Sequence, residues 1–183
     1  PVAPEVLLDD PDLADHGIAV IPTPGHAAHH QSYVHAGTLF VGEAAGTYLD
    51  LGDGRWYLRP ATPPRFFLET ALASVDRLLD WSPTPQRIAF AHHGLATGRS
   101  EALLGRARQQ LRHWVQTVGE VHAADPQAGF DTFADRCIAQ LRRTDPHFAL
   151  GAELPADIQS RERDFTRQTL RGMLEHVQRD GSP

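Results

Sequence analysis

The chain has 183 residues, 41% of them hydrophobic and 22% charged, which is typical of a folded protein and excludes a disordered chain. Its net charge of −6 argues against nucleic acid as the main partner, because phosphate binding needs a positive surface. The single cysteine excludes an internal disulfide, and no apolar run approaches the roughly 20 residues that cross a bilayer. We expect a cytoplasmic protein with a small-molecule substrate and no nucleic-acid or membrane partner.

The first third of the chain is predicted to form short strands. An apolar run at 18–21 ends at a Pro-Thr-Pro-Gly turn, and two β-rich segments at 31–34 and 38–41 form a predicted hairpin. A second hairpin is expected at 48–58, around a Gly-Asp-Gly turn. Three histidines, His26, His29 and His30, follow the predicted strand at 18–21.

The middle of the chain combines a helix with a strand. Apolar residues recur at helical spacing over 68–79, and the apolar segment 87–91 is typical of a buried strand. Because a strand, a helix and a strand follow one another, the sequence favours a layered α/β arrangement.

The last part of the chain is predicted to be helical. Ser100 is the expected N-cap of the first helix, a second helix covers 130–141, and a third covers 156–177. The positions expected to face inward in the third helix are Ile158, Phe165, Leu170, Met173, Leu174 and Val177. We divide the chain into an α/β part at 1–98 and a helical region at 99–183.

Three side chains that bind metals follow three predicted strands. His26 lies in the turn after the first strand, Glu43 follows the strand at 38–41, and His92 follows the strand at 87–91. Since a rigid sheet can hold such residues at its edge, two imidazoles and one carboxylate can converge on a divalent metal such as Zn, Fe or Mn.

These motifs together resemble the metallo-β-lactamase fold hydrolases, including the glyoxalase II-like branch. The resemblance rests on Thr-Pro-Gly-His with a second histidine four residues later, on strand-Gly-Glu in place of strand-Gly-Asp, and on strand-His-x-Gly. It covers about 18–94 and implies the C-terminal half of an αββα sandwich followed by a helical region.

The resemblance also implies residue roles. His26 would bind the first of two zinc ions, Glu43 would bridge both ions, and His92 would bind the second. His30 would support the loop, and His93 lies close enough to touch substrate. Iron or manganese could replace zinc. The family hydrolyses esters, thioesters or phosphoesters with a hydroxide held between the metals, so no catalytic serine or cysteine is needed.

Two departures from the family pattern limit this expectation. The bridging residue is usually Asp, and Glu43 is one methylene longer. The family's His-x-His-x-Asp-His signature is absent from all 183 residues, so each metal would keep one histidine and a share of Glu43. Because a catalytic zinc site has about three protein ligands, we expect this chain alone to hold metal weakly and to be inactive.

Three interpretations remain open at this point. The first is a fragment of a metallo-hydrolase that lacks its N-terminal half. The second is a non-catalytic module or one half of a split protein, which would associate with itself or with another chain. The third, a diiron redox domain on the same scaffold, predicts an attached flavin domain, of which the sequence contains no sign.

Overall fold

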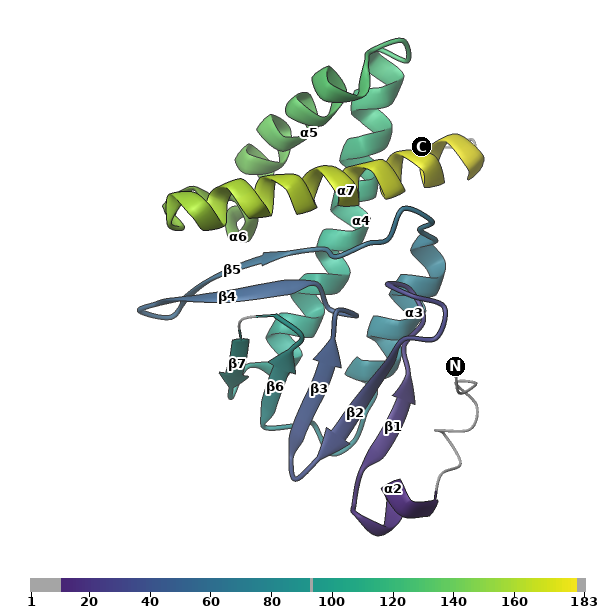
Figure 1. Cartoon of the computed structure of the whole chain (residues 1–183), viewed down its shortest axis with the longest axis vertical. Helices are drawn as coiled ribbons and strands as arrows, with labels where there is room; N and C mark the ends of the chain where they lie inside the picture. The colour runs from purple at the N-terminus through teal and green to yellow at the C-terminus, as the bar shows by residue number, and fades with distance from the viewer. Residues whose placement is uncertain (1–10, 93, 181–183) are drawn as a thin grey trace.

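A computed structural model of the chain describes residues 11–92 and 94–180. A five-stranded sheet forms one layer, with strand order β1-β2-β3-β6-β7 (Figure 1). Its strands are β1 (Ala19–Pro22), β2 (Gln31–His35), β3 (Thr38–Gly42), β6 (Arg87–Phe90) and β7 (Gly94–Thr97). A short helix, α2 (Pro11–Asp15), precedes β1.

The pairing of these strands gives three of them the same direction. β2 is antiparallel to both β1 and β3, and β3 is parallel to β6. Strands β1, β3 and β6 therefore end at the same edge of the sheet, as their arrows in Figure 1 show. Side chains that directly follow these three strands must lie near one another.

Two helices cover one face of the sheet. They are α3 (Leu68–Leu79) and α4 (Ser100–Ala124), which lie behind the sheet in Figure 1. The inward side of α3 carries Leu72, Val75 and Leu78, which pack with Leu39 and Ile88 of the strands in one continuous core. Burial of this apolar side drives the helix onto the sheet, at about 25 cal/mol per Å² of apolar surface removed from water.

A separate hairpin and the remaining helices lie beyond the strand ends (Figure 1). The hairpin pairs β4 (Thr47–Gly52) with β5 (Arg55–Arg59). The other elements are α5 (Phe130–Thr144), α6 (Pro146–Ala149), the 3₁₀ helix η1 (Leu150–Glu153) and α7 (Ala156–Asp180). None of the helices in the described ranges is both long enough and apolar enough to cross a membrane.

The structure confirms the predicted α/β class and corrects three details. Strand β7 was not predicted, because its short Gly-Leu-Ala-Thr sequence carries almost no β-strand signal. Arg99 is the N-cap of α4, and Ser100 is already helical, so its hydroxyl lies beside the first turn and has no hydrogen-bond partner. Phe165 was expected in the core but is 43% exposed, because α7 buries Glu162 and Thr166 instead.

The other face of the five-stranded sheet carries an apolar row, which we name the open row. Directly paired positions place Val20, Tyr33, Phe40, Ala89 and Leu95 side by side across all five strands. Phe40 is 45% exposed and Leu95 is 56% exposed. An apolar row of this length on a sheet face indicates a surface that another protein layer covers.

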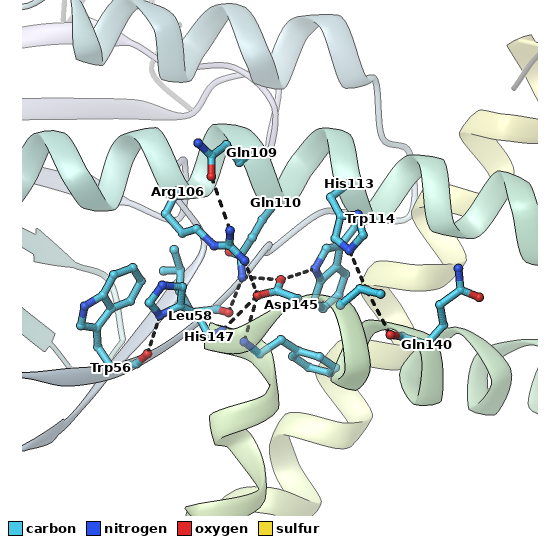
Figure 2. A network of polar contacts seen from close by, with 12 residues as sticks. Trp56, Leu58, Arg106, Gln109, Gln110, His113, Trp114, Gln140, Asp145 and His147 are labelled. Atoms are coloured by element: carbon cyan, nitrogen blue, oxygen red, sulfur yellow. Dashed lines mark hydrogen bonds and ion pairs between the residues drawn. The ribbon is translucent and has the colours of Figure 1, made fainter.

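A buried carboxylate, Asp145, connects the helical region to the hairpin (Figure 2). Its side chain accepts hydrogen bonds from Arg106 at 2.6 Å, Gln110 at 2.8 Å and Trp114 at 2.9 Å, all on α4. It also caps α6 by accepting from the backbone of His147 and Phe148. Gln110 donates in addition to the Leu58 carbonyl of β5, at 2.7 Å.

The Asp145 carboxyl keeps its charge in this setting. Burial alone would raise its pKa, but the hydrogen bonds from Trp114, Arg106 and Gln110 outweigh burial and lower the pKa below its usual value. A group with a lowered pKa contributes stability that is present above its unfolded pKa and is lost as the pH falls through the folded value.

We predict that Asp145→Asn lowers the free energy of unfolding by about 3 kcal/mol at pH 7, because it leaves Arg106 without its buried counter-charge. The loss should shrink below about pH 4, where Asp145 begins to be protonated in the unfolded chain while it stays charged in the folded one. Urea unfolding at the two pH values measures this. Asp135→Asn is the matched control, since Asp135 pairs with Arg167 at the surface, and it should cost less than about 1 kcal/mol.

Candidate metal centre

The structure brings together His26, Glu43 and His92 at one edge of the sheet. His26 lies in the turn between β1 and β2, Glu43 directly follows β3, and His92 lies two residues after β6. Each strand is anchored in the core, so the three side chains are presented by a rigid support. His93, the remaining predicted residue of this region, lies outside the described residues.

The Glu43 carboxylate lies between the two imidazoles. Its Oε2 is 2.9 Å from His26 Nε2, and its Oε1 is 3.5 Å from His92 Nε2. The hydrogen bond from His26 lowers the Glu43 pKa by more than burial raises it, and the charges of His26 and His92 lower it further. The same hydrogen bond raises the pKa of His26, against an opposing effect of burial.

The orientation of His26 is fixed by the backbone of residue 61. Nδ1 lies 3.1 Å from the Ala61 carbonyl oxygen, which can only accept, so Nδ1 carries the hydrogen. At 2.9 Å, Nε2 donates a second hydrogen to the Glu43 carboxylate, which makes His26 a protonated imidazole in this arrangement. With Nδ1 held by the Ala61 carbonyl, Nε2 is the nitrogen that loses this proton when a metal ion binds.

His30 holds the backbone of Glu43 through a chain of hydrogen bonds. The Glu43 amide donates to His30 Nε2 at 3.1 Å, so His30 is neutral, and its Nδ1 donates to Thr23 Oγ1 at 2.8 Å. Thr23 in turn donates to Ser32 Oγ, whose own hydrogen goes to the Val41 carbonyl. Burial lowers the pKa of His30, with a smaller contribution from the His26 charge, which agrees with a neutral ring.

Gly42 makes this contact possible. It has a φ of +59°, and a Cβ at this position would lie 2.4 Å from His30 Nε2. Only glycine adopts this backbone conformation without strain and leaves room for the imidazole. The Gly-Glu dipeptide at the end of β3 therefore presents the Glu43 side chain while His30 binds its amide.

These residues fit part of a metal site. Ligands of a tetrahedral zinc ion stand about 3.4 Å apart, close to the two separations between Glu43 and the imidazoles. A metal beside His26 would have two protein donors, and so would a metal beside His92. In agreement, residues 11–92 and 94–180 contain no group of three or more His, Cys, Asp or Glu side chains placed to hold one ion.

A cavity of about 380 Å³ opens beside these residues. His26, Glu43 and His92 line one side of it, and helix α7 lines the other. The residues that α7 contributes are Arg161, Glu162, Phe165, Gln168 and Thr169. The size of the cavity is that of a site for a small molecule.

Known proteins resemble this chain in sequence and in fold, although no family model matches it. A curated metallo-β-lactamase fold-containing protein, ST1585 of Sulfurisphaera tokodaii, is 34% identical over 86 residues, which cover 47% of this chain and 30% of that protein. Over these residues, this chain is similar in sequence to a metallo-β-lactamase fold protein.

This chain has the fold of part of a metallo-β-lactamase fold protein, as the match to one solved structure shows. The metallo-β-lactamase family protein TTHA1429 of Thermus thermophilus matches 90% of this chain with a TM-score of 0.53 and 18% identity, and 44% of that protein is covered. The crystal structure of ST1585 matches 51% of this chain and 32% of its own, at 31% identity and a TM-score of 0.42. The chain thus spans less than half the length of either metallo-β-lactamase fold relative.

Sequence reasoning did not identify several residues around the centre. The Ala61 carbonyl and the pair of Thr23 and Ser32 carry no motif that a sequence reader would select. The α7 residues that line the cavity likewise belong to no motif. What joins them is tertiary packing of the hairpin and α7 over the sheet edge of this metallo-β-lactamase fold chain.

We predict that His30→Ala accelerates hydrogen exchange of the Glu43 amide by about five- to tenfold, because it removes a hydrogen bond with a net value of about 1 kcal/mol. Amide exchange measured by NMR tests this. His29→Ala, at the exposed neighbouring histidine, is the control and should leave that amide unchanged. Equal exchange rates in wild type and His30→Ala would contradict the hydrogen-bond chain.

Proposed function

We propose that this chain contributes to a metal-dependent hydrolase that cleaves an ester, thioester or phosphoester. The observation that carries the proposal is the Glu43 carboxylate between two imidazoles at the edge of a sheet, with a cavity beside them. His26, Glu43 and His92 are the proposed ligands, and zinc is the proposed metal, with iron or manganese as alternatives.

Each residue has a distinct part in this proposal. His26 would hold one ion, His92 would hold a second, and Glu43 would contribute its carboxylate to both. When bound, such ions supply a nucleophile near neutral pH and polarise the carbonyl or phosphoryl group. The Ala61 carbonyl keeps the His26 ring in the tautomer that metal binding needs, and His30 keeps the Glu43 backbone in place.

The proposal includes further ligands from outside this chain. Two protein donors for each ion fall short of the three that catalytic zinc sites have. The open row across the sheet supports a second β-layer, which we propose is another part of the same protein that covers this face and brings the missing ligands. The complete protein should then bind metal more tightly than this chain.

A relation to the glyoxalase II-like branch is the narrower form of the proposal. In that branch, helices follow the last metal ligand, and in this chain helix α7 forms the wall of the cavity opposite His26 and His92. This arrangement favours a substrate that extends from the metal centre to α7.

We predict that Co²⁺ binds this chain weakly and that His26→Ala and His92→Ala each reduce its affinity by at least about tenfold. Visible absorption of Co²⁺ during a titration measures the affinity. His113→Ala is the control, because His113 of α4 contacts Thr144 at the end of α5, and its removal should leave the affinity unchanged.

The complete protein allows the decisive assay with ester, thioester and phosphodiester substrates. Hydrolysis that disappears in His26→Ala and His92→Ala supports the proposal. If the complete protein contains no stoichiometric metal, or if both variants keep full activity, the ligand assignment is wrong. A metal-bound protein that cleaves none of the three classes contradicts the hydrolase assignment.

A further inference from the structure

Helix α7 presents one continuous side to the cavity. Arg161, Phe165 and Gln168 follow one another at spacings of four and three residues, and Glu162 and Thr169 follow the same spacing one position later. All five line the cavity that His26, Glu43 and His92 line from the other side. An inference about these residues rests on the proposed function, because they face its metal centre.

Glu162 fixes the position of α7 against the hairpin. Its Oε2 accepts from Arg59 Nε at 2.5 Å and from the Tyr57 hydroxyl at 3.2 Å, and all three residues are buried. Thr169 and Thr62 add hydrogen bonds between α7 and the segment after β5. The residues next to Glu162 and Thr169 are therefore held on a rigid wall.

Arg59 and Arg161 share one carboxylate, Glu162, on this side of the cavity. Arg59 donates to Glu162 Oε2, whereas Arg161 Nε lies 3.9 Å from Oε1, which is beyond hydrogen-bond distance. The Arg161 side chain lines the cavity and is 37% exposed. A guanidinium that reaches a cavity without a hydrogen-bonded carboxylate is a donor for a ligand that carries negative charge.

Phe165 adds an apolar surface beside that charge. Its ring is 43% exposed although it lines the cavity, and the Arg59 guanidinium carbon lies 5.5 Å from the ring centroid. An exposed aromatic ring one helical turn from an arginine offers a stacking surface for the apolar part of a ligand.

We infer that the cavity selects substrates with an anionic group, a carboxylate or a phosphate, which Arg161 binds while Phe165 contacts an apolar portion. The scissile bond then lies toward His26, Glu43 and His92. A cavity of about 380 Å³ is large enough for a small molecule that spans both sides.

Three probes of similar shape test this inference on the metal-free chain: phenylacetate, phenyl phosphate and neutral phenylacetamide. NMR chemical-shift titrations give their dissociation constants. We expect at least one acid to bind about tenfold or more tightly than the amide, and Arg161→Gln to remove that preference. Phe165→Ala should weaken the acid and the amide alike. The two acids distinguish a carboxylate site from a phosphate site.

Arg163→Gln is the matched control, because Arg163 lies on the same helix, is largely exposed and pairs with Asp135 at 3.5 Å. It should bind the acids as wild type does, and thermal unfolding shows whether each variant is folded. The inference is overturned if neither acid binds saturably, if folded Arg161→Gln keeps the preference, or if Arg163→Gln loses it equally. The titration uses neither metal nor a hydrolysis assay. A negative result would therefore contradict the anion-binding inference without contradicting the proposed hydrolase function.

Discussion

The segment Pro60–Pro64 is the constraint on which the rest of the site depends. On one side, the Ala61 carbonyl accepts the Nδ1 hydrogen of His26 and so fixes the direction of its other nitrogen. On the other side, Thr62 donates to the Thr169 carbonyl of α7, at 3.2 Å. Gly172 permits this close packing, because a Cβ there would lie 2.1 Å from the Pro63 carbonyl oxygen. This one segment thus fixes both the orientation of the His26 imidazole and the position of α7, which forms the opposite wall of the cavity.

The two sides of the cavity differ in how their charges are satisfied. At the sheet edge, the Glu43 carboxylate contacts two imidazoles, which are the proposed metal ligands. On α7, the buried Glu162 accepts a hydrogen bond from Arg59, whereas Arg161 Nε lies 3.9 Å from the second carboxylate oxygen. The proposed substrate, with an anionic end next to a metal centre, matches both sides.

Much of the fold could be predicted from the sequence because local signals agree with the tertiary structure. Turn residues together with short apolar or β-rich segments located β1 to β6, and helical spacing located α3, α4, α5 and α7. The three candidate ligands could be found since each follows a strand. Phe165 could not be placed, because the buried side of α7 is partly polar and is defined by Arg59 on a distant strand. The roles of Ala61 and Arg161 likewise arise only from packing between distant segments.

The central claim is that Glu43 lies between two metal-binding imidazoles whose orientation is fixed by the fold. The most direct measurement is ¹⁵N NMR of the histidine rings as Zn²⁺ is added. The account predicts that Nε2 of His26 and of His92 shift as metal-bound nitrogens, while Nδ1 of His26 keeps its hydrogen to Ala61 and His30 stays neutral. Zinc-induced shifts confined to other histidines, or binding through Nδ1 of His26, would contradict it.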